Sequence, residues 1–167
     1  PLRRKVYLAK QSFVREWLVT PIEQIGPDIY SLRPYLLTNS IFVHIPKAAG
    51  LSMTMALYGC RGASHFNVKK YQCIFRDEQF DSMFKFTVVR NPYDRLFSTY
   101  NFLRAGGINE YDDAWARENL QKYRTFEEFV LKWVNRRNIS RNSYVHFRPQ
   151  QDFVIDWNGN VALDYIG

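Results

Sequence analysis

Residues 41–52 read Ile-Phe-Val-His-Ile-Pro-Lys-Ala-Ala-Gly-Leu-Ser, an apolar run that passes into a loop of small residues around Lys47. The apolar run predicts a buried parallel strand over 41–45, and the following residues predict a helix over 52–58. Where a strand turns into a helix through such a loop, backbone N–H groups and the helix N-terminus can surround an anion. The candidate ligands of this phosphate or sulfate are Lys47, Ala49, Gly50, Leu51 and Ser52.

A second anion motif begins where another apolar run, residues 84–89, ends on Arg90. The chain then continues through Asn91 and Pro92 into a segment with helical spacing of its apolar residues, 93–104. Ser98 follows Arg90 by eight residues, so it lies about two turns into this helix on the face nearest the strand end. Two separate anion sites predict a ligand that is anionic at both ends.

The first loop differs from a magnesium-dependent ATP site. The Walker motif requires Gly-x-x-x-x-Gly-Lys-Ser/Thr, whereas Lys47 precedes Gly50 and no acidic strand end offers a magnesium ligand. No Cys or Cys/His spacing typical of zinc occurs either. The sequence therefore predicts anion binding without a metal ion.

The two motifs resemble those of the sulfotransferase superfamily, whose sulfuryl donor is 3′-phosphoadenosine 5′-phosphosulfate (PAPS). In that family a P-K-x-x-G-[ST]-[ST] loop holds the 5′-phosphosulfate, and an R-[ND]-P-x-x-R-x-x-S segment holds the 3′-phosphate. Residues 44–50 and 90–98 look like the membrane-associated carbohydrate branch and its bacterial relatives, and the stretch from 146 to 167 is similar to a third motif of that branch. Leu51 departs from the pattern, because a hydroxyl usually stands there, so Ser52 alone must supply that hydrogen bond.

The resemblance implies an α/β fold with three layers, a parallel sheet and the P-loop-like sulfotransferase topology. The βα order, with both motifs at strand ends, agrees with this architecture. The implied reaction moves a sulfuryl group from PAPS to a carbohydrate hydroxyl and leaves 3′-phosphoadenosine 5′-phosphate (PAP). Lys47 would stabilise the leaving oxygen, the loop amides would bind the other oxygens, and Arg90 and Ser98 would bind the 3′-phosphate.

A base must accept the proton of the acceptor hydroxyl, and the chain has only three histidines. His65 lies in a polar, loop-like stretch between the two motifs, and an imidazole is suited to general base work at neutral pH. Because related enzymes often place a histidine base in this interval, His65 is the candidate base, with a surface histidine of no function as the alternative. A structural hydrogen bond is the favoured interpretation of His44. The other candidates for the base are His146 and the acidic stretch Glu110, Asp112 and Asp113.

Length and composition predict one globular domain, because 167 residues with 46% hydrophobic and 17% aromatic content can bury a sizeable core. We expect a lead over 1–40, with an amphipathic helix over 5–19 and a loop-rich approach, and a sulfotransferase domain over 41–167 that is truncated at its C-terminus relative to the family. Cys60 and Cys73 are expected in the core, with a disulfide as the alternative. We also expect a helix capped by Thr125 and a hairpin over 153–163.

The formal net charge of +7 favours anionic partners. The donor nucleotide and an acidic polysaccharide both fit, and nucleic acid is the less favoured partner. Two other functions stay open. One is a kinase-like phosphoryl-transfer enzyme that requires magnesium, and the other is a non-catalytic module that binds nucleic acid or acidic glycans.

The sequence also bears on the compartment. It contains neither an apolar stretch long enough to cross a membrane nor a signal-peptide pattern. We expect a bacterial cytoplasm, which fits free cysteines. The alternative is a Golgi lumen, with a membrane anchor outside this segment.

Overall fold

The structure is a computed structural model that describes residues 12–140 and 143–167. It divides into two compact units. The first, called the sheet unit, comprises the residues up to Val89 together with 150–167, and the second, called the helical unit, comprises residues 90–149. No helix among the described residues is long and apolar enough to cross a membrane.

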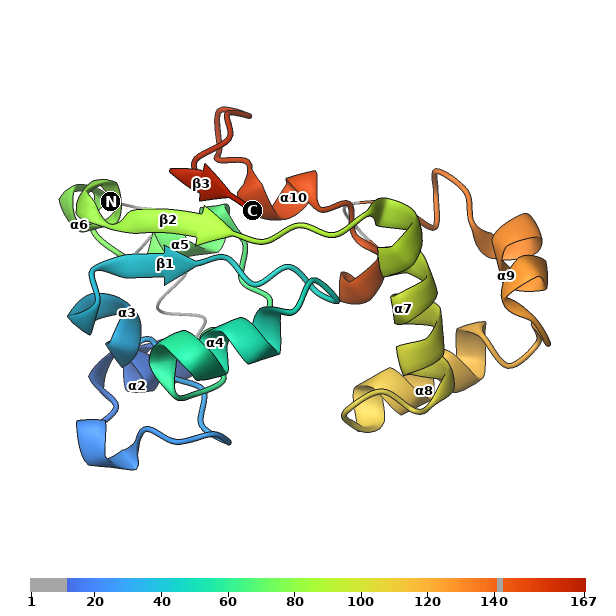
Figure 1. Ribbon diagram of the computed structural model, residues 1–167, viewed down its shortest axis with the longest axis horizontal. Helices are drawn as coiled ribbons and strands as arrows, with labels where there is room; N and C mark the ends of the chain where they lie inside the picture. Colours follow the sequence, from blue (N-terminus) through green and yellow to red (C-terminus); the bar gives the residue numbers. More distant parts are fainter. Residues whose placement is uncertain (1–11, 141–142) are drawn as a thin grey trace. The chain divides into compact units, whose positions relative to one another are not determined.

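The sheet unit is built on three parallel strands in the order β1-β2-β3. These are β1 (Ser40–Phe42), β2 (Phe84–Thr87) and β3 (Tyr165–Ile166), which lie side by side in Figure 1. The two expected strands are therefore present but shorter than predicted, and hydrogen bonds outside the assigned strands extend the pairing: Val43 N–H donates to the Phe86 carbonyl at 2.8 Å, and Val89 N–H to that of Gly167 at 2.8 Å. The α/β class and the parallel sheet are confirmed.

Helices surround this sheet. They are α2 (Ser12–Val19), α3 (Arg33–Leu37), α4 (Gly50–Tyr58), α5 (Val68–Ile74), α6 (Asp77–Ser82) and α10 (Gln151–Val154), with a 3-10 turn at Ile22–Gln24. Figure 1 shows α4 below β1 and α5 behind the strands. Both helices reach the outer edge of β1. The main-chain N–H of Phe42 donates to the Tyr58 hydroxyl at 3.1 Å, and the Tyr71 hydroxyl donates to the Phe42 carbonyl at 3.3 Å. The tyrosines thus bind main-chain groups on the edge of β1 that no strand of the described residues pairs with.

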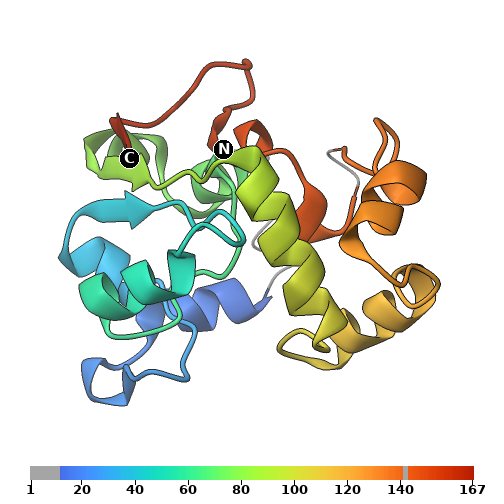
Figure 2. The ribbon, with the colours of Figure 1, turned by 45° about the vertical axis from the view of Figure 1, so that its right-hand side comes forward.

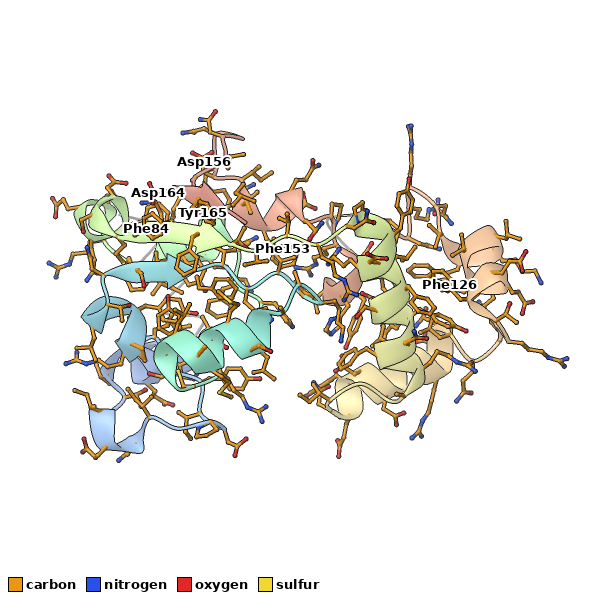
Figure 3. All side chains as sticks on the ribbon, in the orientation of Figure 1. Phe84, Phe126, Phe153, Asp156, Asp164 and Tyr165 are labelled. Atoms are coloured by element: carbon orange, nitrogen blue, oxygen red, sulfur yellow. The ribbon has the colours of Figure 1, made fainter. Side chains whose placement is uncertain are left out.

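A buried lysine ties β2 to its neighbours. The Lys85 ammonium donates to the main-chain carbonyls of Phe80 at 3.2 Å and Met83 at 2.7 Å, at the end of α6, and lies 3.4 Å from the Asp164 carboxylate. A cation at a helix C-terminus is electrostatically favourable. Asp164 also accepts from the Lys85 main-chain N–H at 2.7 Å, just before β3. Figure 3 labels Asp164 beside Tyr165, a residue of β3 that is exposed.

The helical unit contains α7 (Pro92–Arg104), α8 (Glu110–Asn119), α9 (Phe126–Trp133) and a 3-10 turn at Val145–Phe147. In Figure 2, α8 adjoins the C-terminal end of the long helix α7. An aromatic core packs these helices together, with Phe129 and Leu103 fully buried. The predicted cap of α9 is confirmed, because Thr125 accepts from the Glu128 N–H at 3.1 Å. The Glu128 carboxylate accepts in turn from the N–H of Arg124, one residue before the cap.

The predicted hairpin over 153–163 is wrong in most of its length. Phe153 and Val154 belong to α10, and the antiparallel pairing is reduced to one bridge between Ile155 and Val161. The turn itself is present, since Asp156 N–H donates to the Asn160 carbonyl at 2.8 Å. The turn residues therefore specify a local reversal, but the residues before it are held by helix α10.

Two further expectations concern the cysteines and the N-terminal helix. Cys60 and Cys73 are both buried and free, as expected for core cysteines. The predicted N-terminal helix is present as α2, and its first part, residues 5–11, lies outside the described residues.

Candidate functional site

The loop between β1 and α4 contains two non-glycine residues in the left-handed backbone region. Lys47 has a φ of 65° and Ala49 a φ of 57°. This conformation costs about 1–2 kcal/mol for a residue with a Cβ atom, so the surrounding structure must hold it. A turn hydrogen bond from the Ala48 N–H to the Ile45 carbonyl, 3.3 Å long, closes the loop. The backbone therefore fixes where the half-buried Lys47 side chain leaves the loop.

The N-terminus of α4 offers its amides to an acceptor from outside the helix. Its N-cap residue, Ala49, has no side chain that could accept a hydrogen bond. The other helices of seven or more residues whose N-cap is described are all capped by a side chain, from Asn67, Asn91, Asn109 or Thr125. First-turn amides carry the positive end of the helix dipole. Those of Gly50, Leu51 and Ser52 can therefore bind an anion, and the Leu51 and Ser52 side chains are exposed.

Two histidine rings lie beside this loop. His44 follows β1 and is only 8% exposed. A Cβ atom added to Gly50 would lie 1.7 Å from its Cδ2 atom, so the His44 ring rests on the first residue of α4. The half-buried His65 comes from the segment between α4 and α5, and its ring meets that of His44 edge-on with centroids 4.4 Å apart. The structure thus places the predicted base against His44, three residues before Lys47.

The second predicted anion motif begins α7 in the helical unit. Asn91 caps this helix by accepting from the N–H groups of Tyr93 at 2.9 Å and Asp94 at 3.4 Å. Arg90 is exposed and immediately precedes the cap. Ser98 lies seven residues beyond Asn91 and is half-buried, so the two share one face of the helix. This cap was not predicted, although Asn followed by Pro is a typical helix start.

Arg95, the other arginine of this motif, has a structural role. It is 7% exposed, and its guanidinium donates to the main-chain carbonyls of His146 at 3.1 Å and Arg148 at 3.0 Å. Burial lowers its pKa to about 10, so it stays charged at neutral pH. It therefore fastens the turn at Val145–Phe147 to α7.

Two of the other candidates for the base, Asp112 and His146, belong to a buried cluster in the helical unit, whereas Glu110 is exposed. Asp112 is 2% exposed and accepts from the Tyr144 hydroxyl and, at 3.0 Å, from the Ile108 N–H. His146 Nε2 lies 3.3 Å from the same carboxylate. Burial, followed by the hydrogen bond to Asp112, raises the pKa of Tyr144. Asp112 and His146 thus hold the helical unit together, and Asp113 of α8 pairs with Arg117.

A comparison with protein families matches residues 38–163 to the model described as "Sulfotransferase family". The matched residues include the Lys47 loop, His65 and the segment from Arg90 to Ser98. No curated protein and no solved structure matches the chain.

Proposed function

Because the chain belongs to the Sulfotransferase family, we propose that it transfers a sulfuryl group from PAPS to a hydroxyl of a carbohydrate. The observation that carries this proposal is the loop between β1 and α4, which combines Lys47 with a helix start that lacks a side-chain cap. Both features suit the anionic end of a donor.

The 5′-phosphosulfate would bind at this loop. The amides of Ala49, Gly50 and Leu51 and the Ser52 hydroxyl would hold its oxygens, and Lys47 would contact the oxygen that bridges sulfur and phosphorus. When the acceptor oxygen bonds to sulfur, the bond from sulfur to this bridging oxygen breaks, and negative charge gathers on the departing phosphate. A fixed ammonium at that oxygen stabilises the transition state more than the ground state.

The 3′-phosphate would bind Arg90 and Ser98. The parallel strands β1 and β2 end at the same edge of the sheet, where β1 leads to the Lys47 loop and β2 leads through Val89 to Arg90. An arginine side chain recognises phosphate through charge-assisted hydrogen bonds, and the Ser98 hydroxyl can add another. A 3′-phosphate distinguishes this donor from ordinary adenine nucleotides.

His65 would take the proton of the acceptor hydroxyl. Support comes from its contact with His44, which rests on Gly50 at the start of α4. The competing groups Asp112 and His146 are buried, and His146 Nε2 lies 3.3 Å from the Asp112 carboxylate. The positive net charge of +7 favours an acidic polysaccharide as the acceptor.

A transfer assay with sulfur-labelled PAPS tests the proposal. The protein is incubated with acidic and neutral polysaccharides, with and without a metal chelator, and both PAP release and labelled glycan are measured. We expect chelator-insensitive labelling of a glycan. ATP-dependent, magnesium-dependent phosphorylation would instead support a kinase-like enzyme. A binding module would be supported if the protein bound glycans in a salt-sensitive way, released no PAP, and bound them equally well after Lys47→Ala.

A further inference from the structure

Gly50 stands at a position whose backbone does not require glycine. The described glycines with positive φ are Gly59, Gly62, Gly106, Gly107 and Gly159, and Gly50 is not among them. It is the first residue of α4, and helices intrinsically favour alanine over glycine, by about 1 kcal/mol in a helix interior. The reason for glycine must therefore lie in what surrounds it.

The His44 ring occupies the space that a side chain at residue 50 would need. An added Cβ atom would lie 1.7 Å from Cδ2, 2.1 Å from Nε2 and 2.5 Å from Cγ of His44. All three distances are far below van der Waals contact, and the ring is attached to the chain just after β1. Because His44 is only 8% exposed, it has little room to move away.

The His44 ring also meets His65. The two rings are 4.4 Å apart and inclined at 72°. The segment that carries His65 is itself anchored, because the N–H of Ala63 donates to the buried Tyr35 hydroxyl at 3.3 Å. His44 therefore touches two segments, the start of α4 and the loop before α5.

We infer that His44 is a positioning residue, a spacer whose ring sets the distance between the start of α4 and His65. The inference rests on the proposed function, in which the sulfuryl group binds at the start of α4 and His65 accepts the proton. Transfer is efficient only when base, acceptor and sulfur are held within a fraction of an ångström of the productive arrangement. Gly50 is then required because it lets the His44 ring approach the helix.

A double-mutant cycle tests the spacer contact without any assay of activity. Gly50→Ala should lower the melting temperature by at least about 4 °C in the unmutated background, because the new methyl group overlaps the His44 ring. In the His44→Ala background the same change should be neutral or stabilising, because the overlap is gone and alanine favours the helix. Gly26→Ala is the matched control, since its added Cβ would meet nothing within 4 Å. An equal change in melting temperature for Gly50→Ala in both backgrounds would show that the His44 ring does not contact residue 50.

Proton NMR and kinetics test the effect on His65. With only three histidines in the chain, the His65 ring signal can be assigned by its loss in His65→Gln. His44→Ala should shift that signal and lower kcat by about tenfold or more, while KM for PAPS changes less than twofold. His44→Phe keeps an aromatic ring in the same place and should recover most of kcat.

The outcomes separate this inference from the proposed function. If the unmutated protein transfers no sulfuryl group, the proposed function fails, and the inference fails with it even where the cycle and the NMR signal confirm the contact. If transfer occurs but His44→Ala keeps kcat within twofold, His44 does not position the base. If His44→Phe is as slow as His44→Ala, the imidazole acts by its chemistry and the spacer role is wrong.

Discussion

Arg95 donates a hydrogen bond from its guanidinium to the main-chain carbonyl of His146, 3.1 Å away, from inside the core of the helical unit. The same carbonyl accepts from the Thr99 hydroxyl at 3.3 Å. Two residues of α7, four positions apart, thus hold one carbonyl of the 3-10 turn. Within a motif that otherwise suggests anion binding, Arg95 stabilises the fold.

Arg95→Met should therefore destabilise the helical unit. The methionine fills similar space but leaves the Arg148 carbonyl without this donor and weakens the bonding of the His146 carbonyl, at a cost of about 2 kcal/mol or more. Urea unfolding followed by circular dichroism measures this loss. Arg104→Met is the control, because Arg104 is exposed, donates a hydrogen bond to the Tyr123 carbonyl at 3.2 Å and lies over the face of the Tyr100 ring. Equal losses for the two variants would contradict the structural role of Arg95.

Glycine at position 49 should stabilise the protein. Ala49 has a φ of 57°, and glycine removes a strain of about 1–2 kcal/mol while adding about 0.4–1 kcal/mol of unfolded-state entropy. We expect a net gain of about 0.5 kcal/mol, seen as a higher melting temperature. Ala48→Gly, at the preceding residue, is the matched control. It should destabilise the protein, because Ala48 is buried and is not among the described residues with positive φ. A loss for Ala49→Gly as large as for Ala48→Gly would show that the loop is not strained.

Lys47→Ala should reduce the rate of sulfuryl transfer by about 10²–10³, because one transition-state charge contact is lost. The melting temperature should stay nearly the same, since the half-buried side chain belongs to a loop. Steady-state kinetics with labelled PAPS measure the rate, and the exposed Lys122 provides a control for charge through Lys122→Ala. Near-normal turnover in Lys47→Ala would assign the leaving-group contact to another residue.

The start of α9 should lose stability in acid. The hydrogen bond from Lys132 and then that from the Arg124 N–H lower the pKa of Glu128 from its ordinary value of 4.5. A carboxyl with a lowered pKa stabilises the folded state above its ordinary pKa, and this contribution disappears as the pH falls through the folded value. Glu128→Gln should thus have a lower melting temperature than the unmutated protein at pH 7, and the gap should narrow and close as the pH falls below the ordinary value of 4.5. A gap that persists in acid would show that charge is not its cause.

The motifs at strand ends predicted the part of the fold that positions the site. The apolar run before His44 specifies β1, as expected for a strand buried in a parallel sheet. The segment before Arg90 forms β2 although it includes the buried polar residues Lys85 and Thr87. The cap at Thr125 predicted α9 for a similarly local reason. The hairpin failed where local turn signals compete with helix α10, which packs near α5 in the sheet unit.

The contacts made by side chains were beyond prediction from one sequence. The approach of His44 to Gly50 joins residues six positions apart across a loop. Two residues of that loop, Lys47 and Ala49, have a left-handed backbone. Glycine is the usual sequence signal for that conformation, and neither residue is glycine. The burial of Arg95 and Asp112 was also missed, because both residue types are usually exposed. Their partners, His146 and Tyr144, lie far along the chain.

Titration calorimetry with PAP and ADP distinguishes the proposed donor from ordinary adenine nucleotides, because PAPS carries a 3′-phosphate that ADP and ATP lack. We predict that PAP binds at least about tenfold more tightly than ADP without magnesium, and that Arg90→Ala removes most of the difference, since a charge-assisted contact contributes about 1.5–3 kcal/mol. The exposed Arg136, changed to alanine, should leave the preference intact. Equal affinity of the unmutated protein for PAP and ADP would contradict the assignment of PAPS as the donor.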